Sequence, residues 1–241
     1  AKGETVIENA AREPEIVQLC DALNTMGANI DGISTDKIII EGVEELQSAD
    51  LDVIPDRIEA GTYLIAGAAM GEITLNYCNP NHLDVLIEKL IQAGAIIATS
   101  ENSISIKKAN PINPVDVTTE VYPGFPTDLQ AQWIALMAIA SGSSVVTDTV
   151  YHDRFTHIPE LNRLGANIEL HDNIAKINGV DHLIGAPVMS TDIRASAALI
   201  LGAIMARGKT DISRVYHIDR GYELIEKKFQ ALGVDIVRKN D

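Results

Sequence analysis

Hydrophobic and polar positions along the chain change their period in a fixed order. Residues 129–139 are apolar around most of a helix, which predicts a buried helix. Residues 144–150 are rich in β-branched side chains and predict a strand, and a second helix is expected at about 158–164. Residues 167–170 and 174–177 alternate polar and apolar, which predicts two antiparallel strands joined by a turn at 171–173.

This order of helix, strand, helix, strand and strand, with a strand expected before the first helix, recurs along the chain. It fits residues 56–108 and 188–238, and it fits 3–41 if the first helix is omitted. Glycines that should end helices stand at Gly27, Gly94, Gly165 and Gly233, with spacings of 67, 71 and 68 residues. This period exceeds the roughly 20–50 residues of common solenoid repeats. We therefore predict an α/β fold of βαβαββ units, about three and a half of them.

The domain boundary is expected in the segment 51–56, where Pro55 interrupts the pattern just before an Asp-led helix. Residues 1–54 are then the remnant of a first domain, and residues 55–241 form a second domain of three repeats. Because the chain opens in the middle of a repeat, we expect it to be a fragment of a longer protein.

Composition narrows the class of protein. The chain has 19 basic and 34 acidic residues and a net charge of −15, which argues against general nucleic-acid binding. It has no run of about 18 apolar residues and no signal-peptide pattern, so we expect no membrane association. Its two cysteines fit a reducing cytoplasm. An anionic ligand would need a local cluster of arginines.

Two loops of the chain are near copies of each other. Residues 150–154 read Val-Tyr-His-Asp-Arg and residues 215–220 read Val-Tyr-His-Ile-Asp-Arg. Each loop follows an apolar helix that opens with Thr-Asp, at 127–128 and at 191–192. Arg154 and Arg220 therefore stand at equivalent points of successive repeats, where they could hold a charged small molecule.

Asp128 and Asp192 are each open to two interpretations. A carboxylate on the first turn of a buried helix stays ionised at a fixed position, which suits a general base that a ligand can reach. The same carboxylate could only cap its helix, and Thr127 is a plausible N-cap before Asp128.

Arg154, Arg194 and Arg220 are also open to two interpretations. Arginine grips carboxylate and phosphate with two parallel hydrogen bonds, and Arg194 lies close to a helix N-terminus, where anions are favoured. Alternatively, the three could pair with acids such as Asp153, Asp219 or Glu223.

Other reactive groups give weaker signals. The six histidines lack metal-ligand spacing, and the chain has neither a P-loop nor a dinucleotide fingerprint, so we expect no metal and no cofactor. We expect Cys20 to be a core residue, whereas Cys78 beside Asn79-Pro80 could be partly exposed.

Several segments in the same order resemble the UDP-N-acetylglucosamine 1-carboxyvinyltransferases of the enolpyruvyl transferase family. The most specific is Phe-Pro-Thr-Asp-Leu-Gln-Ala-Gln at 125–132, and the supporting segments are 8–15, 55–59, 191–196 and 217–223. The resemblance implies an inside-out α/β barrel architecture with two domains of three βαβαββ units each, and an active site between the domains.

The resemblance also implies a reaction. The enolpyruvyl group of phosphoenolpyruvate would pass to the 3-hydroxyl of UDP-N-acetylglucosamine, the first committed step of peptidoglycan synthesis and thus a step towards cell shape and division. Asp128 would be the base and Val150 would line the nucleotide-sugar site. Arg220 would hold phosphoenolpyruvate with Arg154 and Arg194 nearby, and Asp192 is a further substrate-binding candidate.

The chain departs from the family pattern in one respect. The family's cysteine acid in a Gly- and Arg-containing loop, and its early Lys-Asn pair, have no match here, because Cys20 and Cys78 lie in other settings. We therefore expect this polypeptide alone to lack transferase activity. Two alternatives remain: the enolpyruvyl transferase of the shikimate pathway, and a non-catalytic binding module of the same fold.

Overall fold

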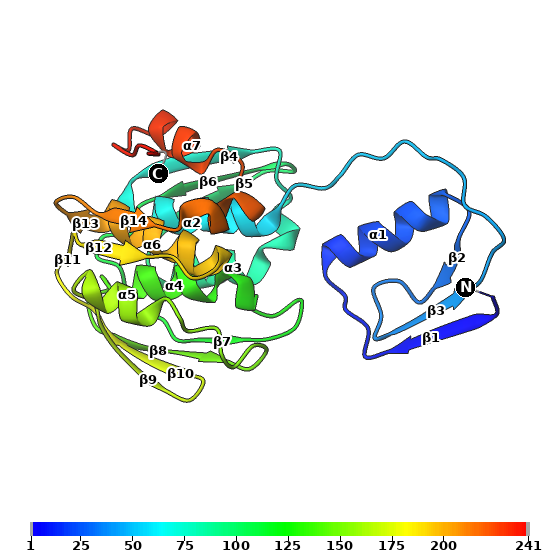
Figure 1. The fold of residues 1–241 in the computed structure, drawn as a ribbon, viewed down its shortest axis with the longest axis horizontal. Helices are drawn as coiled ribbons and strands as arrows, with labels where there is room; N and C mark the ends of the chain where they lie inside the picture. Colours follow the sequence, from blue (N-terminus) through cyan, green and yellow to red (C-terminus); the bar gives the residue numbers. More distant parts are fainter. Residues whose placement is uncertain (1, 240–241) are drawn as a thin grey trace.

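The computed structural model describes residues 2–239, which form a smaller and a larger body joined by an extended connection at 42–56 (Figure 1). In the smaller body, α1 packs on an antiparallel sheet of order β1-β3-β2 around Cys20, Ile30 and Ile38. The strand-helix-strand-strand order expected for 3–41 is confirmed. Its elements are β1 (Glu4–Glu8), α1 (Pro14–Thr25), β2 (Asn29–Asp31) and β3 (Lys37–Glu41).

The larger body contains three successive repeats. The first has α2 (Arg57–Met70), β4 (Glu72–Asn76), η1 (Pro80–His82), α3 (Asp84–Gln92), β5 (Ile96–Thr99) and β6 (Ser103–Lys107). The second has β7 (Val117–Thr119), η2 (Thr127–Leu129), α4 (Gln130–Met137), β8 (Ser143–Asp148), α5 (Ile158–Arg163), β9 (Asn167–His171) and β10 (Ile174–Asn178). The third has β11 (Leu183–Ile184), β12 (Pro187–Met189), α6 (Ile193–Met205), β13 (Ala206–Arg207), β14 (Asp211–Ser213), η3 (Val215–Arg220) and α7 (Ile225–Ala231).

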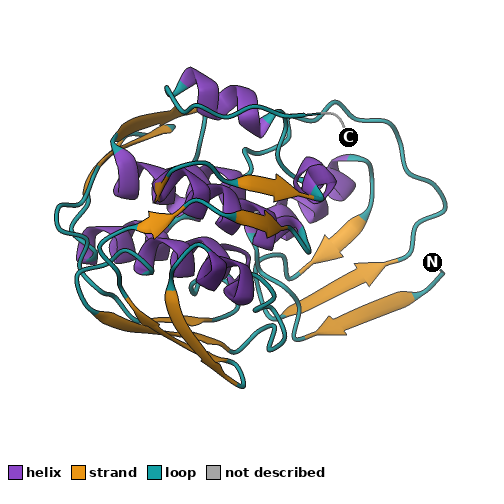
Figure 2. Ribbon diagram, turned by 60° about the vertical axis from the view of Figure 1, so that its left-hand side comes forward, coloured by secondary structure: helices purple, strands orange, loops and turns teal. Residues whose placement is uncertain are grey.

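Helices α2, α4 and α6 pack against one another in the centre, and the strands lie around them (Figure 2). All eight residues of α4 are buried, as are residues 60–69 of α2 and 195–202 of α6. A helix that is apolar on every side needs such surroundings, so the prediction of a buried helix at 129–139 is confirmed. No helix within residues 2–239 has the length and apolar character to cross a membrane.

The second repeat is a complete βαβαββ unit. Its sheet has the order β7-β8-β10-β9, with β7 parallel to β8 and the other pairs antiparallel. The predicted turn at 171–173 joins β9 to β10, and Asp172 adopts a φ of 52° there. The first repeat forms an antiparallel sheet of order β4-β6-β5, and the third forms two parallel pairs, β11-β13 and β12-β14.

The glycines that recur in each repeat share one backbone conformation. Gly27, Gly94, Gly165 and Gly233 each follow a helix and have φ values of 98°, 98°, 89° and 88°. Side chains rarely adopt this left-handed region, so glycine is the residue that ends a helix in this way.

Two expected features are absent from the described part of the chain. No strand forms in the connection 42–56 before α2, where Pro55 lacks an N–H and the side chain of Gln18 binds the carbonyl of Asp52 (2.7 Å) and the N–H of Ile54 (3.1 Å). No strand pair follows α7 in residues 234–239, where Ile236 offers its carbonyl to the side chain of Gln230.

Candidate active site

Each of the three central helices begins near an aspartate, and two of these aspartates are caps. Asp56 accepts hydrogen bonds from the N–H groups of Ile58 (2.7 Å) and Glu59 (3.1 Å) at the start of α2. Asp192 accepts from the N–H groups of Arg194 (2.8 Å) and Ala195 (2.9 Å) at the start of α6. The helix-capping interpretation of Asp192 is therefore confirmed.

Asp128 is different, because its helix begins with the 3₁₀ turn η2 and has no side-chain cap. The prediction that Thr127 is an N-cap is wrong, since its hydroxyl donates to Oδ2 of Asp148 (2.6 Å). The carboxylate of Asp128 caps no helix and is bound by two arginine side chains instead. Nη1 of Arg154 donates to Oδ1 of Asp128, and Nη2 of Arg194 donates to Oδ2 at 2.8 Å.

Asp128, Arg154 and Arg194 form a charged triad, and its electrostatics follow from its partial burial. The side chains of Asp128, Arg154 and Arg194 are 33%, 24% and 17% exposed. Burial alone would raise the pKa of Asp128, but the guanidinium groups of Arg194 and Arg154 outweigh it and hold that pKa below its usual range. The carboxylate is thus ionised at neutral pH and occupies a site with two cationic groups.

A buried polar cluster contacts the backbone of Asp128. Nε2 of Gln132 donates to the backbone carbonyl of Asp128 (3.0 Å), to Oγ1 of Thr62 (3.2 Å) and to the hydroxyl of Tyr222 (3.3 Å). The hydroxyls of Thr62 and Tyr222 are also hydrogen-bonded to each other at 2.8 Å. These contacts fix the start of α4 against α2 and against the segment after η3.

A cavity of about 280 Å³ opens beside Asp128, between the two bodies. It is lined from the larger body by Thr127, Asp128 and Val150, whose side chain is well exposed. The smaller body contributes Glu13 and Glu15. The structure therefore brings the predicted residues Asp128 and Val150 to one cavity, with Arg154 and Arg194 bound to Asp128.

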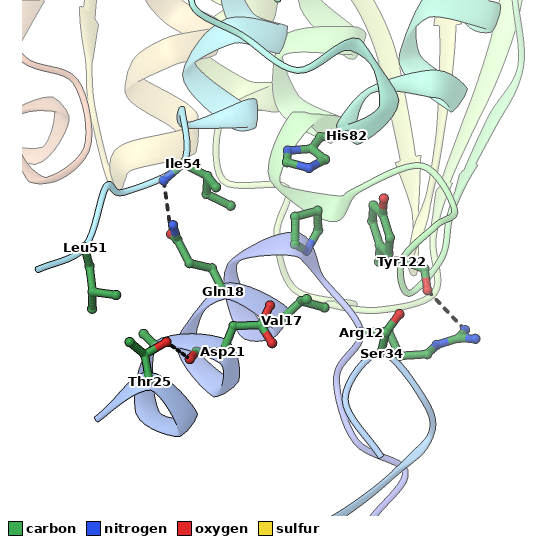
Figure 3. Close-up of a pocket in the computed structure, with 12 residues that line it drawn as sticks. Arg12, Val17, Gln18, Asp21, Thr25, Ser34, Leu51, Ile54, His82 and Tyr122 are labelled. Carbon is green, nitrogen blue, oxygen red and sulfur yellow. Dashed lines mark hydrogen bonds between the residues drawn. The ribbon is translucent and has the colours of Figure 1, made fainter. Parts of the chain in front are cut away.

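Contacts between the bodies surround this cavity. The guanidinium of Arg57 forms two hydrogen bonds with the carboxylate of Glu15, at 2.9 and 3.1 Å, and lies 5.5 Å from the centre of the Tyr122 ring. Nη2 of Arg12 donates to the carbonyl of Tyr122 at 3.1 Å. Figure 3 shows this contact and the one between Gln18 and Ile54 around a second cavity of about 450 Å³, which contains none of the predicted site residues.

Arg220 is not brought into the triad. It ends the 3₁₀ helix η3, is exposed, and forms no ion pair with any other residue of the described range 2–239. The two near-copied loops differ in backbone because the inserted Ile218 is only 1% exposed and anchors the second loop in the core. The ion-pair interpretations also fail in detail, since Arg154 pairs with Asp128, and Asp219 pairs with Arg238.

The sequence interpretation missed Asp148, which is fully buried at the end of β8. A signal was present, because burial alternates along this strand and an acid at 148 falls on the inward face, in line with Ser144 and Val146. The expectation that Cys78 is partly exposed is wrong, since it is 5% exposed, and burial raises the pKa of its thiol. Cys20 is a core residue, as predicted.

Comparisons with known proteins agree with this architecture. A family model described as EPSP synthase (3-phosphoshikimate 1-carboxyvinyltransferase) matches residues 1–229. The enolpyruvyl transferase NikO from Streptomyces tendae has a similar structure, with a TM-score of 0.87 and 26% identity over 98% of this chain and 57% of that one. The α/β fold expected from the sequence is thereby confirmed.

Curated relatives are similar along the whole chain. The protein from Hydrogenovibrio crunogenus is 50% identical over 242 residues, which cover 100% of this chain and 58% of that protein. The protein from Chlorobium chlorochromatii is 52% identical over 99% of this chain and 57% of its own length. Both are named UDP-N-acetylglucosamine 1-carboxyvinyltransferase, and this chain spans less than two thirds of each. With the family model matching nearly its full length, the chain belongs to the EPSP synthase family of carboxyvinyltransferases, also called enolpyruvyl transferases.

Proposed function

We propose that this chain supplies the base-carrying part of a UDP-N-acetylglucosamine 1-carboxyvinyltransferase. The observation that carries the proposal is the carboxylate of Asp128, which is not used as a helix cap and lies at an interbody cavity beside two arginines. The names of its curated relatives support the choice of substrates, phosphoenolpyruvate and UDP-N-acetylglucosamine. In this proposal residues 1–54 belong to one domain and residues 55–241 to the other.

The reaction needs a base at the sugar. The 3-hydroxyl of the amino sugar gives its proton to the carboxylate of Asp128 while its oxygen bonds to the second carbon of phosphoenolpyruvate. The methylene carbon gains a proton from the cysteine acid that the resemblance implies, which this chain does not match, and a tetrahedral ketal forms. The ketal then returns a carbon-bound proton to that cysteine and expels phosphate, so that the enolpyruvyl ether forms.

The arginines have two tasks in this scheme. Without substrate, Arg154 and Arg194 hold Asp128 ionised but also make it a weak base, because their charges lower its pKa. The carboxylate and phosphate of phosphoenolpyruvate compete for the same guanidinium groups, which favour bidentate anions. When phosphoenolpyruvate binds one of these guanidinium groups, the pKa of Asp128 rises. The carboxylate thus becomes a stronger base once both substrates are bound.

The remaining predicted residues take peripheral roles. Val150 lines the cavity on the nucleotide-sugar side, and Arg220 adds a cation for phosphoenolpyruvate. Asp192 acts through its cap, which fixes the N-terminus of α6 and with it the backbone of Arg194. The product would enter peptidoglycan synthesis in the cytoplasm and thereby serve cell shape and division.

The experiment that tests this function uses a chimera. Residues 1–241 replace the matched 58% of the Hydrogenovibrio crunogenus relative, and phosphate release from phosphoenolpyruvate is followed with UDP-N-acetylglucosamine or with shikimate 3-phosphate as the acceptor. We expect release with the nucleotide sugar only, and no turnover by residues 1–241 alone.

The controls separate the alternatives. A folded chimera, checked by circular dichroism, that turns over shikimate 3-phosphate instead would establish the shikimate-pathway function. A folded chimera that binds both ligands in calorimetry but releases no phosphate would support the non-catalytic binding module. Either result would contradict the proposal.

A further inference from the structure

Asp148 combines complete burial with a full set of hydrogen-bond donors. Its exposure is 0%, and no lysine, arginine or histidine among residues 2–239 forms an ion pair with it. Oδ1 accepts from the N–H groups of Val150 (3.0 Å) and Tyr151 (2.9 Å) and from the hydroxyl of Thr119 (2.7 Å). Oδ2 accepts from the hydroxyl of Thr127 (2.6 Å). A buried carboxylate that accepts hydrogen bonds from neutral donors holds each of them in a defined direction.

These donors come from segments that meet at the triad. Thr127 immediately precedes Asp128, and the N–H groups of Val150 and Tyr151 belong to the loop that carries Arg154. The carboxylate of Asp148 therefore ties the segment of the base to the segment of its arginine. Thr119 lies on β7 and is tied to the same carboxylate, and its hydroxyl oxygen also accepts from the N–H of Thr149, the residue before Val150 (3.1 Å).

One of these bonds continues into the triad. Because the hydroxyl of Thr127 donates to Asp148, its oxygen faces Nη1 of Arg154 with a lone pair, at 3.4 Å. That same Nη1 donates to Oδ1 of Asp128. The order of contacts is thus Asp148, Thr127, Arg154 and Asp128, with each hydrogen-bond direction set by the carboxylate that cannot donate.

We propose that Asp148 is a positioning residue, which acts through Thr127 and the 150–154 loop to hold Arg154 on the carboxylate of Asp128. The inference rests on the proposed function, in which Asp128 is the base, and adds a residue that does not touch substrate. The competing interpretation is that Asp148 only stabilises the fold and leaves the Arg154–Asp128 pair unaffected.

The ionisation of Asp128 distinguishes these interpretations. Arg194, Arg154 and the more distant Glu15 are the charged groups that act on it. If Arg154 loosens, the pKa of Asp128 rises towards its usual range, because one of the two cations that lower it has moved away. Loss of fold stability without this movement leaves the Asp128 titration where it was.

The experiment is a titration of the Asp128 side-chain carboxyl by carbon-13 NMR, in the whole chain without substrate. The signal is assigned by its absence in Asp128→Asn, and the pH range is that in which circular dichroism shows a folded chain. The test variants are Thr127→Val and Asp148→Asn, and the matched control is Thr74→Val, which removes a hydroxyl that bonds to Ser105 (2.9 Å) on the sheet of the first repeat. Thr127→Ser restores the hydroxyl.

We expect the Asp128 midpoint to shift upwards in Thr127→Val and in Asp148→Asn, and to stay at the wild-type value in Thr74→Val and Thr127→Ser. The Val150 and Tyr151 amides should exchange about tenfold faster in Asp148→Asn, since each loses a charged acceptor. An unchanged midpoint in Thr127→Val or in a folded Asp148→Asn, or an equal shift in Thr127→Val and Thr74→Val, would overturn the proposal. The two valine variants decide even if Asp148→Asn does not fold. Transferase activity does not enter this measurement, so its result is independent of the chimera assay.

Discussion

Asp128→Asn tests the energetic role of the triad. Hydrogen bonds to charged groups contribute about 1.5–3 kcal/mol each, and Asp128 receives one from Arg154 and one from Arg194. The asparagine keeps a single oxygen acceptor, and the Asp128 side chain is 33% exposed, so solvent screens part of the charge. We therefore expect the variant to lose about 1–2 kcal/mol of the free energy of unfolding at pH 7.

The pH dependence of this loss has a definite sign. The folded state lowers the pKa of Asp128 relative to the unfolded chain, because the two guanidinium groups outweigh its burial. A depressed carboxyl pKa stabilises the fold fully above the unfolded pKa, and the contribution disappears as the pH falls through the folded pKa. The difference between wild type and Asp128→Asn should thus be constant from pH 7 to about pH 5 and shrink below that.

The assay is urea unfolding followed by fluorescence. Trp133 is the single tryptophan of the chain, is fully buried in α4 and stands five residues after Asp128. Asp56→Asn is the matched control, because Asp56 caps α2 and asparagine caps a helix about as well as aspartate. An Asp128→Asn variant as stable as wild type at pH 7, or a difference that persists unchanged at low pH, would refute the reasoning.

Three further predictions use the same unfolding assay. His157 is 1% exposed, and burial lowers its pKa to about 4. As the pH falls from about 6.5 to 4, the free energy of unfolding of wild type should therefore decrease by roughly 3 kcal/mol more than that of His157→Gln. An equal decrease in both proteins would contradict this. Tyr222→Phe removes the hydroxyl that binds Thr62 and Gln132 and should cost about 1–2 kcal/mol, and a cost near zero would show that these bonds add nothing. Gly67→Ala places a Cβ 2.5 Å from Cγ2 of Ile106 and should lower the free energy of unfolding by about 1–3 kcal/mol. In Gly71→Ala the new Cβ meets no atom within 4 Å, so the change should stay within about 0.5 kcal/mol. Equal effects of the two variants would argue against this packing.

The fold was largely predictable because its signals are local. A helix such as α4 that is apolar all round needs a buried place, and the left-handed glycines mark each repeat. The missing strands before α2 and after α7 were not predictable, because strand pairing depends on a neighbour far along the chain. There the backbone groups of Ile54 and Ile236 pair with the side chains of Gln18 and Gln230 instead.

The site was predictable in its residue types and less so in its geometry. The motif around Asp128 and the three arginines Arg154, Arg194 and Arg220 pointed to one charged centre. The structure brings Arg154 and Arg194 to Asp128, but not Arg220. Whether an aspartate caps its helix depends on the turn before it, so Asp128 and Asp192 were indistinguishable. Ile218 is present in the second loop and absent from the first, and its burial gives Arg220 a different position from that of Arg154. The near-identical sequences of the two loops do not show this difference.

The central claim is that the Asp128 carboxylate is the base, and the most direct test is turnover by the chimera. Asp128→Asn should lower kcat by about 10²–10⁴-fold, as loss of a general base does, whereas Asp56→Asn keeps its cap on α2 and should stay close to wild type. A folded Asp128→Asn chimera with wild-type kcat would contradict the claim.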